Sequence, residues 1–320
     1  MVTFLRLTWR LGRWEIAVLI GGSLLFAAVT ALVAWQTSVT EASLQACLTA
    51  DASRVVISAE CKALVDRANL LGAIAPILES ATTVVPFIVG ILLGAPLVAR
   101  EIEKRTAPIA WSLSRSRTRW LVLRAGPLLV AIALGLLLVG QASEALIRAT
   151  PTGELGFAVL AMHGPLVAAR GVAVFCIGVL VGLAMGRTLP AILVTGMAVI
   201  ALLHVLSLGR MRFMEATATW VPQDPFGSQD FSGVVIYRSG FRDDATGELV
   251  PDDEVFQRFP ETFGPEGTGV PPGMTLVYLS TPPGLYPYFV AGEGAALLVI
   301  SALAAGAALS IIRFRRPELG

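Results

Sequence analysis

Six long apolar stretches limit what this chain can fold into. A helix needs about 20 mainly apolar residues to cross the hydrocarbon core of a bilayer, because an unpaired backbone polar group in lipid costs several kcal/mol. Only 15% of the residues are charged, and the mean hydropathy is +0.74. The sequence therefore predicts an all-α polytopic membrane protein and argues against a soluble enzyme. The expected spans are residues 16–35, 80–99, 120–140, 166–185, 190–208 and 288–312.

Basic residues alternate between the segments that join these spans. The segments on one side, which include both termini, hold 14 basic and four acidic residues, whereas those on the other side hold nine basic and 17 acidic residues. Because Lys and Arg concentrate on the cytoplasmic side of membrane proteins, we expect both termini to lie inside the cell. The formal net charge of +1 conceals this difference in charge between the two sides. It also argues against a nucleic-acid-binding protein, which would be strongly basic.

The segments outside the spans predict further parts. Residues 1–15 have apolar side chains on one helical face and three arginines on the opposite face, which predicts an interfacial amphipathic helix. Residues 209–287 are rich in proline and contain β-prone runs, which predicts a small extracellular domain of mixed or β character. The expected division is an interfacial helix at 1–15; spans one to five over 16–208, with an outer loop at 36–69 and a cytoplasmic loop at 99–120; an extracellular domain at 209–287; and the sixth span with a cytoplasmic tail at 288–320.

Four polar residues outside the cytoplasmic loop are candidate partners of one another. Cys47 and Cys61 share the outer loop, where an oxidising environment favours a disulfide, and two free thiols are the alternative. Their spacing fits no zinc motif, and we expect no metal site. Arg170 and Glu293 lie near the outer ends of spans four and six, so we predict a structural ion pair, with contact to substrate as the alternative.

The basic loop after the second span is the most informative segment. It contains Arg100-Glu-Ile-Glu-Lys-Arg-Thr106, followed by Ser116-Arg117 and Trp120. We expect residues 100–105 to form a short charged helix that Pro108 ends. These residues resemble the cytoplasmic loop of ABC type-2 transporter permeases. In that family an Arg-Glu-x-Glu-x-Gly-Thr pattern and a later Ser-Arg-x-x-Trp stretch form the coupling helix, which docks into a cleft of the ATP-binding subunit.

The resemblance implies a non-catalytic permease subunit of an ATP-driven exporter. It implies a dimer, with an identical or a sister permease, and two separate ATP-binding subunits that hold ATP and Mg²⁺. Neither of the two lysines in this chain follows a Gly-x4-Gly frame, so we expect no nucleotide cofactor in the chain itself. Arg105 stands where the family has glycine. The residues implied in coupling are Arg100, Glu101, Glu103, Arg105 and Thr106.

The resemblance also implies a cargo pathway between paired spans two and five. We expect Phe87, Met197 and Leu203 to line it, and their apolar character predicts a hydrophobic or amphipathic cargo such as a drug, an antibiotic or a lipid-like compound. The expected location is the inner (plasma) membrane of a bacterium, which fits the preference for arginine over lysine. A proton-coupled secondary transporter and a membrane sensor or immunity protein are the alternatives. No His-Glu-x-x-His or Gly-x-Ser-x-Gly motif supports an intramembrane enzyme.

Overall fold

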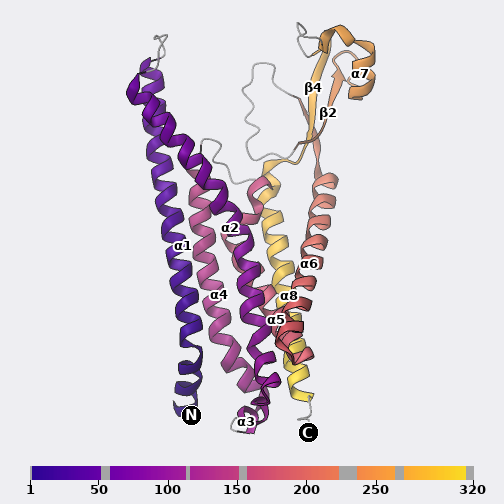
Figure 1. The fold of residues 1–320 in the computed structure, drawn as a ribbon. Coiled ribbons are helices and arrows are strands. Elements are labelled where there is room, and N and C mark those ends of the chain that lie inside the picture. Colours follow the sequence, from indigo (N-terminus) through magenta and orange to yellow (C-terminus); the bar gives the residue numbers. More distant parts are fainter. Residues whose placement is uncertain are drawn as a thin grey trace. The chain divides into compact units, whose positions relative to one another are not determined.

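Helices form most of the part of the chain that the structure describes. The structure is a computed structural model, and it describes residues 2–51, 58–112, 116–150, 157–222, 236–263 and 270–314. Within these ranges six helices are long and apolar enough to cross a membrane, and each contains one predicted span, so the prediction of six apolar helices is confirmed. They are α1 (Val2–Asp51), α2 (Ala59–Glu103), α4 (Arg117–Arg148), α5 (Gly164–Met185), α6 (Thr188–Thr217) and α8 (Tyr286–Phe314) (Figure 1).

The chain divides into two compact units. The first, called here the helical unit, consists of Met1–Leu155, Leu160–His204 and Val290–Gly320. The second, called here the sheet unit, consists of Gly156–Val159 and Val205–Phe289. The sheet unit therefore begins inside α6, four residues before the boundary expected at residue 209.

The helices extend well beyond the predicted spans. The expected outer loop at 36–69 is largely helical, because α1 continues to Asp51 and α2 begins at Ala59. A disulfide joins Cys47 of α1 to Cys61 of α2, with the Cα atoms 5.8 Å apart. The backbone shows no break at residue 15 either, because α1 runs without interruption from Val2 to Asp51. Whether residues 1–15 lie in a membrane interface stays a prediction.

The core of the helical unit is built around α5, which packs closely against α2. Glycines allow the approach: a Cβ atom added at Gly178 would lie 2.8 Å from the backbone nitrogen of Ala95, and one added at Gly94 would meet the backbone of Phe175. Gly182, four residues after Gly178, also approaches the backbone of Ala95, so these glycines serve helix packing within the chain. Gly186, which directly follows α5, has a different role, because it ends the helix in a left-handed conformation with φ 65°.

Within its described residues, the sheet unit contains four antiparallel strands in the order β1-β4-β2-β3. Phe241, Val255 and Met274 form its buried core, where α7 (Asp252–Arg258) packs on the sheet. At the turn after β2, the backbone N–H groups of Thr246 and Ala245 donate to Asp243, and these bonds lower the pKa of its carboxyl group. The strands are β1 (Thr219–Pro222), β2 (Ile236–Asp243), β3 (Leu249–Val250) and β4 (Met274–Ser280). The β-prone runs of the sequence are residues 233–237 and 274–279. The second lies in β4, whereas most of the first lies outside the described residues.

Candidate functional site at the end of α2

The C-terminal turn of α2 forms a Schellman motif. The N–H of Arg105 donates to the carbonyl of Ile102, and the N–H of Thr106 donates to the carbonyl of Glu101, both at 3.0 Å. The Thr106 hydroxyl also donates to the Glu101 carbonyl, at 3.2 Å. These bonds satisfy carbonyl groups that a helix end otherwise leaves unpaired, so the turn after α2 is fixed in direction.

Arg105 occupies the left-handed position of this motif, with φ 58°. A Cβ atom makes this conformation costly, which explains why glycine suits the position in the pattern that the sequence resembles. The helix expected over residues 100–105 is therefore wrong at its end, because α2 stops at Glu103 and Arg105 already belongs to the turn.

We predict that Arg105→Gly raises the free energy of unfolding by about 1 kcal/mol, because glycine adopts the left-handed conformation without steric cost. The measurement is the thermal unfolding midpoint of the purified full chain in detergent. Lys104→Gly is the matched control, because Lys104 has φ −79° and gains nothing from glycine. Equal shifts in the two variants would contradict the assignment of strain to Arg105.

A short helix, α3 (Ala107–Ser112), follows the turn. Pro108 lies in its first turn, so the expectation that Pro108 ends a helix is wrong: proline lacks an N–H group, and the first turn of a helix does not need one. Trp111 is buried and meets Trp120 of α4 edge to face, with ring centroids 6.3 Å apart. Ile109 points the other way and is 63% exposed. The turn and α3 therefore hold the apolar side chain of Ile109 on the surface of the loop.

Both glutamates of the acidic pair have partners within the chain. Arg124 of α4 places Nη2 3.6 Å from Oε1 of Glu101. Glu103 Oε2 accepts the backbone N–H of Thr188 at 2.9 Å, and Thr188 is the first residue of α6. A carboxylate at a helix N-terminus satisfies an unpaired donor and is stabilised by the helix dipole. The end of α2 is thus joined to α4 and α6.

The remaining loop residues are exposed, as Glu103 is, and the expected pathway residues are exposed or half-buried. Arg100, Arg105 and Thr106 all have exposed side chains. The Thr106 hydroxyl nevertheless donates to the Glu101 carbonyl. Phe87 is half-buried on α2, while Met197 and Leu203 are 66% and 36% exposed on α6. The chain encloses none of these three, so any pathway that they line needs a further wall.

Arg170 and Glu293 lie together in the interior of the helical unit. Glu293 Oε1 accepts from Arg170 Nη2 at 2.5 Å and from Nε at 3.2 Å, and Arg170 Nη1 donates to the Ala161 carbonyl at 2.9 Å. The two residues are 4% and 7% exposed. This pair ties α5 to α8, and its burial makes it a structural contact of the helical unit.

A second buried carboxylate, Glu144 of α4, escaped the sequence analysis. Its Oε1 accepts the N–H of Gly164 at 2.6 Å and lies 2.9 Å from Nδ1 of His163, the N-cap residue of α5. The sequence offered one sign of this carboxylate, because Arg148 follows Glu144 by one helical turn. In the structure Arg148 Nη2 lies 3.8 Å from Glu144 Oε2, and the Arg148 side chain is largely exposed. Among the described residues, no three His, Cys, Asp or Glu side chains gather in a way that could hold a metal ion.

Six apolar helices and a fixed polar turn after the second of them define a multi-pass α-helical membrane protein with a structured loop. The family model for ABC-2 membrane transporter related proteins matches residues 23–210, which is more than half of the chain. The chain therefore belongs to this family and is an ABC-2 type permease. Such permeases are typically non-catalytic membrane subunits that work with an ABC ATP-binding subunit. No curated protein and no solved structure matched the chain.

Proposed function

We propose that this chain is the permease subunit of an ATP-driven exporter, and that the turn after α2 together with α3 transmits the movement of an ATP-binding subunit. The observation that supports this best is the pair of contacts that join the end of α2 to α4 and α6. A loop fixed to three spans transfers a rigid-body movement to all of them, whereas a free loop does not. ATP and Mg²⁺ belong to the partner subunit in this proposal.

We assign the α3 end of the helical unit to the cytoplasm. The distribution of basic residues supports this side, and the disulfide between Cys47 and Cys61 supports an oxidising environment at the opposite end. Both termini are then cytoplasmic, the sheet unit is extracellular, and the membrane is the inner membrane of a bacterium.

The cargo in this proposal is a hydrophobic or amphipathic compound that leaves the cell. A second permease, either an identical copy or a sister chain, supplies the missing wall of the pathway, and two ATP-binding subunits complete the exporter. The support is the exposed apolar surface of α6, which includes Met197, Ile200 and Leu203. Apolar walls bind apolar cargo by removing its surface from water.

We predict that Ile109→Asp weakens binding of the ABC ATP-binding subunit by at least about tenfold, because it places a charge on the exposed apolar side chain of α3. The measurement is co-purification of the subunit with the full chain, together with stimulation of its ATP hydrolysis. Leu48→Asp is the matched control, since Leu48 is 44% exposed near the opposite end of the helical unit. Transport by the reconstituted chain alone, driven by a proton gradient, would contradict the proposal and favour a secondary transporter.

A further inference from the structure

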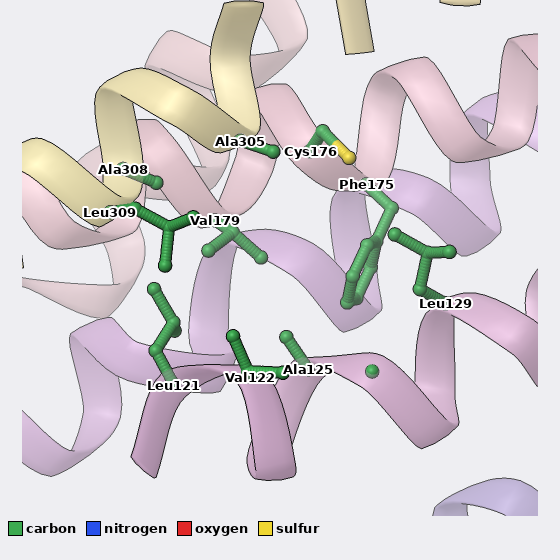
Figure 2. A pocket seen from close by; sticks show the side chains of 11 residues that line it. Leu121, Val122, Ala125, Leu129, Phe175, Cys176, Val179, Ala305, Ala308 and Leu309 are labelled. Carbon is green, nitrogen blue, oxygen red and sulfur yellow. The ribbon is translucent and has the colours of Figure 1, made fainter. Parts of the chain in front are cut away.

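An apolar pocket lies among α4, α5 and α8 in the helical unit. Every residue that lines it is apolar or glycine, apart from the free thiol of Cys176, and Figure 2 shows the side chains of the three helices converging on it. Its volume is about 200 Å³, below the roughly 300–1,000 Å³ of pockets that hold drug-sized molecules. Val122 in its wall is 55% exposed, so the pocket opens at the surface of the unit. It has room for a length of hydrocarbon chain, and it is too small for a whole cargo molecule.

The position of the pocket along the helices places it within one leaflet. On α4 the lining begins at Leu121, four residues after the helix starts at Arg117, and on α8 it ends at Leu309, five residues before Phe314. At a rise of about 1.5 Å per residue, the pocket begins roughly 6–8 Å from both helix ends. Lipid headgroups meet a spanning helix near its ends, so the pocket lies at the depth of the first part of an acyl chain.

Two arginines continue the walls of the pocket toward those helix ends. Arg119 precedes Val122 by three residues, and Arg313 follows Leu309 by four, so each lies on the same helical face as its pocket residue. Arg119 is half-buried, and among the described residues its guanidinium has no ion-pair or hydrogen-bond partner. Arg313 is exposed and lies 5.8 Å from the ring centroid of Phe314. Two cations at the headgroup level complement a phosphate.

We propose that this pocket binds one acyl chain of an anionic phospholipid, and that Arg119 and Arg313 contact its phosphate group. The pocket supplies apolar contact and the arginines select the headgroup. The inference goes beyond the proposed function, because it requires only that the helical unit lies in a bilayer. Lipid retention by the isolated full chain tests the proposed lipid site without any ATP-binding subunit. A negative result would therefore overturn the lipid site and leave the transport proposal untouched.

The first experiment fills the pocket. A Cβ atom at Gly126, which lines the pocket, meets nothing within 4 Å, so Gly126→Leu extends into open space. Gly306→Leu is the matched control, because Gly306 of α8 is equally unhindered and does not line the pocket. Native mass spectrometry of the purified full chain counts the phosphatidylglycerol retained. We expect one retained lipid in the wild type and in Gly306→Leu, and about tenfold weaker retention in Gly126→Leu. If Gly126→Leu does not fold, Val122→Trp closes the pocket from its exposed side.

The second experiment tests the headgroup with phosphatidylcholine of the same acyl chains. We expect the wild type to retain phosphatidylglycerol about tenfold more strongly, and the double variant Arg119→Gln with Arg313→Gln to lose that preference. The double variant Arg119→Lys with Arg313→Lys keeps both charges and is expected to keep most of the preference for phosphatidylglycerol. Equal retention of both lipids by the wild type overturns the assignment of the arginines. Undiminished retention after the pocket is filled overturns the site itself.

Discussion

Arg170→Leu is expected to lower the free energy of unfolding by about 3–5 kcal/mol, because it leaves the carboxylate of Glu293 as an unpaired charge in the interior. Arg170 and Glu293 are 4% and 7% exposed, and the substitution also removes the donor to the Ala161 carbonyl. The measurement is the thermal unfolding midpoint of the purified full chain in detergent, together with the fraction that remains monodisperse after heating. An unchanged midpoint would contradict a structural role for the pair.

A matched control comes from an exposed arginine–glutamate contact of the helical unit. Arg148 places Nη2 3.8 Å from Glu144, and its side chain is 64% exposed. Arg148→Leu is therefore expected to cost no more than about 1 kcal/mol, which is typical of exposed ion pairs. The comparison separates the effect of burial from the effect of removing an arginine.

A second control separates unpaired charge from lost packing. The double variant Arg170→Leu with Glu293→Leu removes both charges, and apolar replacement of a buried pair is often neutral or stabilising. We expect it to recover most of the stability that Arg170→Leu loses. A double variant whose loss equals the sum of the two single losses would show that the charges act independently, and the ion pair would then be the wrong explanation.

The six spans could be predicted because hydrocarbon imposes one strong rule on composition over about 20 residues. The ends of the helices could not, because outside lipid that rule no longer applies. The polar part of α1 after residue 35 is still helical, and α2 lies close enough for Arg67 to donate to Gln36 across the hairpin. Such a contact depends on two segments 31 residues apart, and hydropathy does not encode it.

The loop after α2 illustrates the same limit at the level of a site. Its residue types predicted a helix followed by a turn, and the left-handed position of Arg105 explains the glycine of the pattern that it resembles. The partners of the acidic pair could not be predicted, because Thr188 is 85 residues from Glu103 and is recognised through its backbone. A backbone donor leaves no signal in its side chain, so only the packing of α2 against its neighbours reveals it.

Glu103→Ala is expected to reduce transport about tenfold while leaving the complex with the ATP-binding subunit intact. Glu103 accepts the N–H of Thr188 at 2.9 Å, and substitution by alanine removes this capping contact. That loss frees the start of α6 from the end of α2, so movement of the loop no longer reaches α6. The measurement is ATP hydrolysis and transport in the same reconstituted complex, expressed as cargo moved per ATP hydrolysed.

The variants around Glu103 distinguish a positioning residue from a docking residue. Lys104→Ala is the control, because Lys104 is the next residue along the chain, is also exposed, and makes hydrogen bonds to the other described residues through its backbone alone. Glu103→Gln keeps an acceptor oxygen for the Thr188 N–H and is expected to retain most of the coupling, whereas it removes the charge that an ion pair with the ATP-binding subunit would need. If Glu103→Gln and Glu103→Ala both weaken the complex, the carboxylate contacts the partner directly, and the link between α2 and α6 is not what couples ATP hydrolysis to transport.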